Sequence, residues 1–179
     1  MKLSWSHKIF LKINSHIGQR PRLDRFMYFC GFWLIWIDGA LFFAVLTFVY
    51  TKNFHWGVTS LKVFLATTVL SYLMSYFVAL LWPHARPVKE LPQVKNLFKT
   101  LGNWKSFPSD HTIAVTIFSL IAFFASGSWI IGIIFFLLAL FVAFGRVYGG
   151  VHYPRDIVGG GVVALLAFAL VVIILYTQQ

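Results

Sequence analysis

Five long apolar runs constrain this chain more than any other feature of its sequence. A membrane-spanning helix needs about 20 predominantly apolar residues, and the runs occupy residues 26–50, 60–82, 111–126, 128–145 and 157–176. Only 11% of the residues are charged, whereas a soluble domain carries roughly a quarter. The sequence therefore predicts an all-α integral membrane helix bundle of about five transmembrane helices, forming a single domain over residues 1–179.

The N-terminal segment has a different pattern. Residues 5–17 place apolar side chains at helical spacing, with lysines among the polar positions: Trp5, Ile9, Phe10 and Ile13, with Lys8 and Lys12. Such a pattern is typical of an amphipathic helix that lies in the membrane interface. We expect no cleavable signal peptide, because residues 1–25 carry six Lys or Arg and no long apolar core.

The first apolar run contains an acidic residue, Asp38, near its middle. A carboxylate inside a membrane segment is by default a functional candidate. However, Gly39 follows directly, and no basic partner is identifiable in the sequence. We therefore favour a break at Asp38–Gly39, which would place Asp38 near the start of a shorter membrane helix.

Five spans assign the polar segments to the two sides of the membrane. The N-terminus, the loop at 83–110 and the stretch at 146–156 fall on one face. Residues 51–59, the turn at 126–129 and the C-terminus fall on the other. The chemically suggestive residues all lie in the first group.

The stretch "FPSDHT" (107–112) marks the start of a helix on that face. Ser109 precedes an apolar run and is suited to cap it, which places His111 in the first helical turn. Helix N-termini bind anions through their free N–H groups and the helix dipole.

A second helix start carries another histidine, in "VHYPRDIVGG" (151–160). Pro154 fits the first position of the last helix, with His152 just before it and Asp156 in its first turn. The carboxylate of Asp156 can therefore reach back to a ring nitrogen of His152 and fix its tautomer.

Two arginines complete the set, because Arg86 follows the second apolar run and Arg146 ends the fourth. Guanidinium groups are planar, permanently charged forks that match phosphate oxygens. A lone arginine at a helix end is usually a membrane anchor, and a lone His–Asp pair is more often structural than catalytic. Because all of these residues converge on one face, we interpret them as a phosphate site with a nucleophile and an acid.

These residues resemble three motifs of the type 2 phosphatidic acid phosphatase superfamily. The spacing of Arg146, His152 and Asp156 is similar to the third motif, and "PSDH" is similar to the second, usually Pro-Ser-Gly-His. The "RP" at 86–87 is similar to the end of the first, a lysine followed six residues later by Arg-Pro. The segments "RPxxxLP", "FPSDHT" and "GVHYPRD" look most like the bacterial undecaprenyl pyrophosphate phosphatases of this superfamily.

The sequence departs from the resembled pattern at three positions. The first-motif lysine would fall at Ala79, and Gly145 replaces the serine before Arg146. Asp110 replaces the glycine before His111. We expect the extra carboxylate of Asp110 to raise the pKa of His111 and favour its proton-donor form.

The resemblance implies hydrolysis through a phosphohistidine. His152 would attack phosphorus, oriented and made more basic by Asp156. His111 would protonate the leaving oxygen and then activate water. The phosphate oxygens would be held by Arg86, Arg146 and the Ser109 hydroxyl. Neither a cofactor nor a metal is required, and the six histidines include no "HExxH" or similar metal-binding cluster.

We expect the substrate to be a membrane lipid phosphate or diphosphate, and we favour undecaprenyl pyrophosphate, cleaved to undecaprenyl phosphate. Lys105 or Lys89 could reach its second phosphate. Phosphatidylglycerophosphate, phosphatidic acid and lipid A phosphates are alternatives, as is non-catalytic lipid-phosphate binding or transport. The basic residues behind the net charge of +10 flank the apolar runs, which favours anionic membrane lipids over nucleic acid as partners. The oligomeric state stays open.

Two observations give opposite answers for the side of the membrane on which the site lies. Thirteen of the fifteen Lys and Arg, all except Lys52 and Lys62, lie on the face that carries the site. The positive-inside rule would make this face cytoplasmic. The resemblance instead implies the extracytoplasmic face of a bacterial inner membrane, and we favour that orientation.

Overall fold

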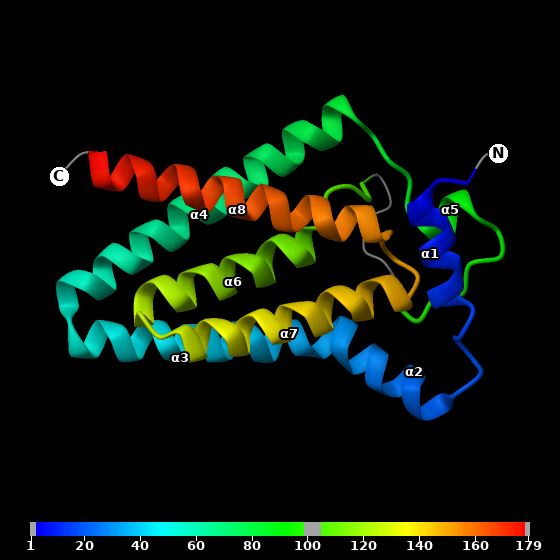
Figure 1. Cartoon of the computed structure of the whole chain (residues 1–179), viewed down its shortest axis with the longest axis horizontal. Coiled ribbons are helices and arrows are strands. Elements are labelled where there is room, and N and C mark those ends of the chain that lie inside the picture. The colour runs from blue at the N-terminus through cyan, green and yellow to red at the C-terminus, as the bar shows by residue number, and fades with distance from the viewer. Residues whose placement is uncertain (1–2, 99–104, 178–179) are drawn as a thin grey trace.

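The computed structural model describes residues 3–98 and 105–177, and within these ranges every regular element is a helix. The bundle consists of α3 (Leu34–Lys52), α4 (Phe54–Leu81), α6 (Asp110–Ser126), α7 (Trp129–Tyr148) and α8 (Pro154–Thr177). At one end lie α1 (Trp5–Asn14), α2 (Pro21–Tyr28) and α5 (Pro87–Glu90), and a π-helical turn, η1 (Phe29–Trp33), joins α2 to α3 (Figure 1). The predicted all-α membrane bundle is confirmed.

Four helical segments in the described ranges are long and apolar enough to cross a membrane: Pro21–Lys52, Phe54–Leu81, Trp129–Tyr148 and Pro154–Thr177. The fifth predicted span is α6, which is apolar but has only 17 residues. At a rise of about 1.5 Å per residue, α6 is about 25 Å long. It therefore begins below the polar end of the bundle, between its longer neighbours.

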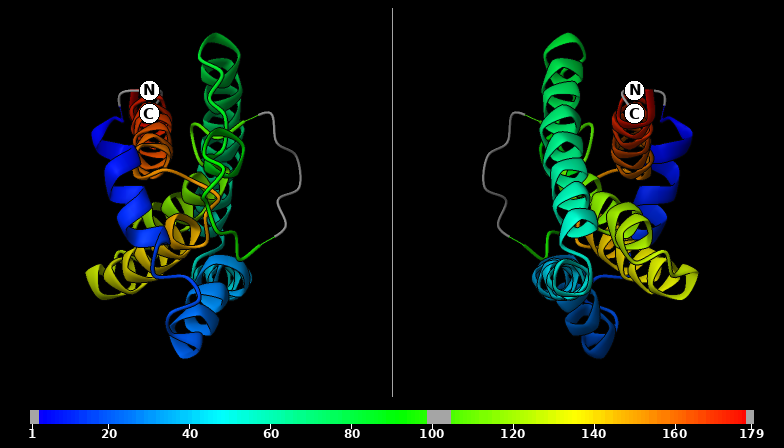
Figure 2. Two further views of the ribbon diagram at one scale, coloured as in Figure 1. Left: turned by 90° about the vertical axis from the view of Figure 1, so that its right-hand side faces the viewer. Right: turned by 90° about the vertical axis from the view of Figure 1, so that its left-hand side faces the viewer.

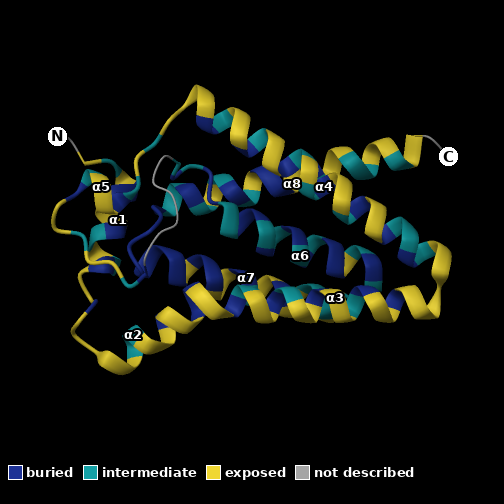
Figure 3. Cartoon of the chain, turned by 180° about the vertical axis from the view of Figure 1, so that it is seen from behind, coloured by how far each residue is buried: buried dark blue, intermediate teal, exposed yellow. Residues whose placement is uncertain are grey.

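Helix α6 packs against α3, α4, α7 and α8. Apolar residues all round its axis are almost completely buried: Ile113, Val115, Ile117, Ile121 and Ala122. Figure 3 shows buried residues along α6 and exposed residues on the outer faces of α3, α4 and α8. A helix that is apolar all round belongs inside a bundle, so the outer helices separate most of α6 from lipid.

The turn expected at 126–129 is present and joins α6 to α7 in a tight hairpin. Gly127 ends α6 in the left-handed conformation, with φ of 64°, which glycine adopts without steric cost. Ser128 then caps α7 by accepting a hydrogen bond from the backbone N–H of Ile131.

Helix α1 lies across the end of the bundle, beside α7 and α8 (Figure 1, Figure 2). Phe10 is fully buried against Val147 and Tyr153, whereas Trp5 and Ile9 remain exposed. The amphipathic helix expected at residues 5–17 is therefore present, with one apolar face on the protein and another available to the membrane interface.

The predicted break at Asp38–Gly39 is wrong, because α3 runs through both residues as a regular helix. The irregular segment is η1, which ends directly before α3. Asp38 is 0% exposed, and neither carboxylate oxygen has a hydrogen-bond partner within the described part of the chain. The fold gives no account of this group, so Asp38 stays a functional candidate.

The two ends of the bundle divide the chain as predicted. In Figure 1 the N-terminal helices, α5 and the α7–α8 connection lie at one end. The α3–α4 turn, the α6–α7 turn and the C-terminus lie at the other. Every predicted site residue therefore comes from segments at the first end.

Cysteine labelling tests this topology. Single cysteines introduced at Gln19 and Gln93 in a Cys30→Ser background should react with an impermeant maleimide from one side of the membrane, and those at His55 and Thr177 from the other. All four positions are exposed, so accessibility reports sidedness. Reaction of His55 and Gln93 variants from the same side would contradict the five-span arrangement.

Candidate active site

The α7–α8 connection positions His152. Gly150 has φ of 85°, a left-handed conformation that lets the chain reverse direction between the helices. A Cβ atom at Gly150 would also lie 2.3 Å from the carbonyl oxygen of Lys95. Pro154 begins α8 as predicted, so His152 is held directly before a helix start and is only 3% exposed.

The His152 ring has two acceptors near Nδ1. The Ser106 carbonyl oxygen lies 3.1 Å away and Asp156 Oδ2 lies 3.6 Å away. A carbonyl oxygen can only accept, so Nδ1 carries the proton and Nε2 keeps its lone pair. The expectation that Asp156 reaches this ring holds, but the closer partner is the backbone of Ser106.

Ser106 is a site residue that the sequence reasoning missed. Its hydroxyl donates to Asp156 Oδ2 at 2.6 Å, and the backbone N–H of Tyr153 donates to the same oxygen at 2.9 Å. The other oxygen, Oδ1, lies 3.6 Å from Arg155 Nε. Asp156 is 0% exposed, so the donors to Oδ2 and the neighbouring His152 compensate part of the cost of burying its charge, while Oδ1 has no hydrogen-bond partner among the described residues.

Burial lowers the pKa of His152, and the hydrogen bond to Asp156 opposes this effect in part. The nearby charges of Arg146 and Arg86 lower the pKa further. The net shift keeps the imidazole neutral at neutral pH. A neutral ring with a free Nε2 has the electronic state of a nucleophile.

His111 occupies the second position of α6, as predicted. Ser109 caps this helix, and its side-chain oxygen accepts from the backbone N–H of Thr112 at 3.5 Å. The backbone N–H of Ser109 donates to the carbonyl oxygen of Asp156 at 3.0 Å, which ties the start of α6 to the start of α8. His111 lies within electrostatic range of His152.

Arg146 is held near the end of α7 and is only 6% exposed. Its Nη1 donates to the Gly31 carbonyl of η1 at 3.1 Å, and its guanidinium stacks over the Phe98 ring at 5.2 Å. Its Nε is buried without a hydrogen-bond partner among the described residues.

Arg86 is the N-cap residue of α5, and its side chain makes no capping hydrogen bond to that helix. Burial lowers its pKa, while Asp110 and Asp156 act in the opposite direction. Its Nε and Nη1 are buried and lack partners in the described ranges. Arg86 and Arg146 are close enough for their charges to interact, so unpaired donors from two cations converge near the histidines.

Asp110 does not act as the free carboxylate that we expected beside His111. It pairs with the ammonium of Lys105 and accepts a hydrogen bond from the Ser75 hydroxyl at 3.3 Å. The charges that act on His111 are those of Arg146, His152 and Arg86, so the expected rise in the pKa of His111 is wrong.

A polar cluster between α1, α5 and the α7–α8 connection supports the site. Glu90 accepts from the Tyr153 hydroxyl at 2.9 Å, and His7 Nε2 lies 3.2 Å from its other oxygen. Burial and the hydrogen bond to Glu90 raise the pKa of Tyr153, so its hydroxyl remains a donor. The cluster fixes α5, and with it Arg86, relative to His152.

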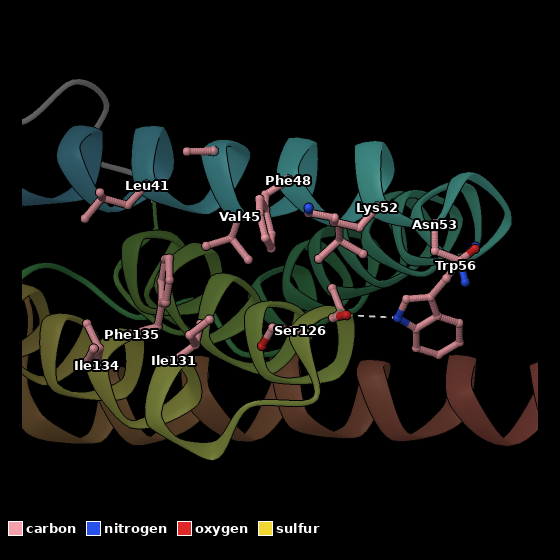
Figure 4. Close-up of a pocket in the computed structure, with 13 residues that line it drawn as sticks. Leu41, Val45, Phe48, Lys52, Asn53, Trp56, Ser126, Ile131, Ile134 and Phe135 are labelled. Carbon is pink, nitrogen blue, oxygen red and sulfur yellow. Dashed lines mark hydrogen bonds between the residues drawn. The ribbon is translucent and has the colours of Figure 1, made fainter.

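One large groove lies away from the candidate site. A groove of about 640 Å³ between α3, α4, α6 and α7 lies at the opposite end, where Trp56 Nε1 donates to the Ala125 carbonyl at 2.9 Å (Figure 4). It is lined mainly by apolar residues and contains none of the predicted site residues. Within the described ranges, no group of three or more His, Cys, Asp or Glu could hold a metal ion.

The fold and this site define a multi-pass membrane protein with a cluster of histidines and arginines at one end of its helix bundle. The PAP2 superfamily profile matches residues 60–179. The chain therefore belongs to the PAP2 superfamily, a family of membrane lipid phosphatases, and the resemblance seen in its motifs is confirmed.

Relatives in sequence and in structure agree with this membership. The chain is 34% identical over 109 residues to the Escherichia coli K12 protein named "Putative undecaprenyl-diphosphatase YbjG", covering 59% of this chain and 54% of the relative. It is 30% identical over 120 residues to the Bacillus licheniformis "Bacitracin transport permease protein BcrC", covering 65% and 54%. The chain thus spans about half the length of the curated relatives that it matches.

Two crystal structures share the fold. Aquifex aeolicus LpxE superimposes with a TM-score of 0.75 at 22% identity, over 96% of both chains. A PAP2-type phosphatidylglycerolphosphate phosphatase from Bacillus subtilis gives a TM-score of 0.57 at 20% identity, over 97% of this chain and 96% of that one.

The structure also explains why glycine precedes Arg146. A Cβ atom at Gly145 would lie 2.5 Å from the backbone nitrogen of Gly31. Gly145→Ser, which restores the usual residue of the resembled motif, should therefore lower stability by about 1–3 kcal/mol. Thermal unfolding in detergent measures the loss, with Gly161→Ser as control, because the nearest atom to that Cβ is 4.0 Å away. Equal melting temperatures for the two variants would contradict the close contact.

Proposed function

We propose that the protein, acting as one domain over residues 1–179, is a lipid phosphatase that works through a phosphohistidine. The main support is the state of His152: Nδ1 donates to the Ser106 carbonyl, Nε2 has no hydrogen-bond partner among the described residues, and burial lowers the pKa of the ring. The unpaired donors of Arg86 and Arg146 lie within electrostatic range of this ring. A nucleophile next to unsatisfied cations is suited to attack a phosphate group.

The proposed reaction has two steps. In the first, Nε2 of His152 bonds to phosphorus while the bond to the leaving oxygen breaks, and His111 gives its proton to that oxygen. In the second, His111 takes a proton from water, which attacks phosphorus and releases His152 and inorganic phosphate. Asp156 stabilises the positive charge that the ring gains in the first step.

The negative charge on the transferring phosphoryl group needs binding partners throughout. Arg86 and Arg146 would supply N–H donors, and Ser109 would donate its hydroxyl hydrogen while its oxygen caps α6. Preorganised donors of this kind supply a large part of the rate enhancement in many enzymes. The steps use side chains and water, so we propose no cofactor and no metal.

Undecaprenyl pyrophosphate is the substrate that we propose, cleaved to undecaprenyl phosphate. The relative from Escherichia coli carries undecaprenyl-diphosphatase in its name. A diphosphate also releases a phosphate monoester, which leaves more easily than a glycerol alkoxide. Ala79 supplies no cation where the resembled motif has lysine, and a site with less charge suits the easier reaction.

Two adjoining apolar grooves could hold the lipid tail. One of about 340 Å³ begins at Thr112, next to His111, and runs between α6, α7 and α8. The other, of about 380 Å³, reaches α1, and the two share Leu140, Ala143 and Ile157. Lipid-binding sites of this kind need mainly apolar walls with the polar groups at one end.

A second candidate substrate class is a glycerol- or glucosamine-linked lipid phosphate: phosphatidylglycerophosphate, phosphatidic acid or a lipid A phosphate. The two structural neighbours favour it, since one is named as a phosphatidylglycerolphosphate phosphatase and the other is LpxE. Lipid-phosphate binding or transport without turnover is a third, which the transport name of the Bacillus licheniformis relative raises.

For location, we propose a bacterial inner membrane with the site on the extracytoplasmic face. The resemblance to phosphatases that recycle a lipid carrier supports this orientation, while the Lys and Arg distribution opposes it. The Gln93→Cys variant tests this orientation. If the site faces outward, an impermeant maleimide should label this variant in intact spheroplasts.

The nucleophile assignment predicts the behaviour of three variants. His152→Ala should lower phosphate release by about 10³-fold or more, and Asp156→Asn should lower it less. His55→Ala, at the opposite end of the bundle, should have no effect. The assay is inorganic phosphate release in detergent, and near-normal turnover by His152→Ala would reject the mechanism.

The pH dependence of the same assay gives an independent check. Because burial lowers the pKa of His152, its nucleophilic form persists to lower pH than that of a free histidine. The acid limb of kcat/KM should therefore fall below the ordinary pKa of about 6.5.

Substrate preference tests the finer proposal. In matched detergent, kcat/KM for undecaprenyl pyrophosphate should exceed that for phosphatidylglycerophosphate and phosphatidic acid. A preference for either glycerol lipid would reject the substrate and keep the phosphatase assignment. If no lipid phosphate is hydrolysed but they still bind, the third candidate is favoured.

The groove supplies a matched pair for the same experiment. Gly161 lines the groove, and its Cβ direction is open, so Gly161→Phe should fill it without disturbing packing. Val162→Phe, on an exposed position of α8, is the control. Gly161→Phe should lower kcat/KM for the lipid and spare a soluble phosphate ester, whereas equal effects on both substrates would contradict tail binding there.

A further inference from the structure

The side chain of Lys105 is unusually enclosed for a loop lysine, at 10% exposure. Its Nζ donates to the Ser75 hydroxyl at 2.6 Å and pairs with the Asp110 carboxylate. The side chain of its partner, Asp110, is much more exposed, at 46%. The loop therefore brings an enclosed cation to the bundle together with a counterion that is about half exposed.

This pair is joined to both halves of the candidate site. Lys105 directly precedes Ser106, which contacts His152 and Asp156. Asp110 directly precedes His111, and its charge acts on Arg86. The ammonium is thus anchored next to the groups that would surround a phosphate.

Unsatisfied donors in the same region point to an anionic ligand. Arg86 has two buried nitrogens without hydrogen-bond partners among the described residues. A phosphate that meets these donors approaches the Asp110 carboxylate, and two anions at short distance repel. The strain is smallest if Asp110 turns outward to water, which its exposure allows, and releases Lys105.

Resting on the proposed function, we infer that Lys105 is a third phosphate-binding cation, which exchanges Asp110 for a phosphate oxygen when substrate binds. Asp110 holds the ammonium in place beforehand and competes with the ligand for it. The flexible four-carbon stem of lysine permits the small movement that this exchange requires.

Orthovanadate binding, measured by thermal shift in detergent, tests the exchange without any lipid substrate. Lys105→Met should weaken binding at least about tenfold, and Lys105→Arg should retain most of it. Asp110→Asn should tighten binding several-fold, because the competing anion is gone. Lys8→Met, which removes an exposed charge from α1 at the same end, is the control and should match the parent.

A double-mutant cycle separates this role from a structural one. If Asp110 acts only by occupying Lys105, Asp110→Asn should have no effect on vanadate affinity in a Lys105→Met background. An equal gain in both backgrounds, or weaker binding by Asp110→Asn alone, would overturn the inference. Lys89→Met is measured in the same assay. A larger loss of vanadate affinity in Lys89→Met than in Lys105→Met would also overturn the inference.

The outcome is independent of the proposed activity. Loss of vanadate affinity in Lys105→Met together with no lipid hydrolysis by the parent would refute the enzyme proposal and retain the cation site. Unchanged affinity together with active parent protein would refute the cation site alone.

Discussion

The Asp156 carboxylate is fully buried at the start of a membrane helix, and the arrangement of the site follows from compensating it. An unpaired charge in such surroundings costs several kcal/mol. The compensating donors come from separate segments: the Ser106 hydroxyl from the loop before α6 and the Tyr153 N–H from the α7–α8 connection. Satisfying Oδ2 of this carboxylate thus joins two helix starts, and the backbone N–H of Ser109 adds a hydrogen bond to the carbonyl oxygen of Asp156. His152 is placed as a consequence, because Ser106 supplies its acceptor.

A second requirement is close approach of backbone to backbone at η1. Gly31 and Gly145 meet at a distance that excludes a Cβ atom on either residue. The approach brings the Gly31 carbonyl to the Arg146 guanidinium, which fixes the side chain while Nε has no partner among the residues that the structure describes. π-helical turns are frequent at functional sites because they displace backbone groups from the regular ladder. Gly31 in η1 and Gly145 in α7 therefore both contribute to positioning Arg146, because their close approach permits its hydrogen bond to the Gly31 carbonyl.

Local pattern in the sequence was sufficient for the spans, the helix starts and their capping residues. The length of an apolar run predicts a membrane helix. Ser109 and Pro154 each determine a helix start through residues less than one helical turn away. The missed features all depend on partners that are far apart in sequence. Ser106 meets Asp156 across 50 residues, and His7 meets Glu90 across 83. His7 has the pattern of an interfacial residue, yet it is 5% exposed, because α1 turns its polar face onto α5.

Asp110 was misjudged because Ser75 is 35 residues away from it in the sequence, and because the loop conformation that brings Lys105 to it follows no regular helical pattern. Its position beside His111 suggested a free negative charge, but Lys105 and Ser75 converge on it from a loop and from α4. Arg86 and Arg146 remain as two cations that repel each other, and each has buried N–H groups without a partner in the described part of the chain. Leaving such donors unsatisfied costs free energy that water cannot recover in an enclosed site. A neutral ligand could satisfy the hydrogen bonds but would leave the repulsion unchanged. A ligand with several acceptor oxygens and more than one negative charge would relieve both, and the phosphate group that we propose as ligand has these properties.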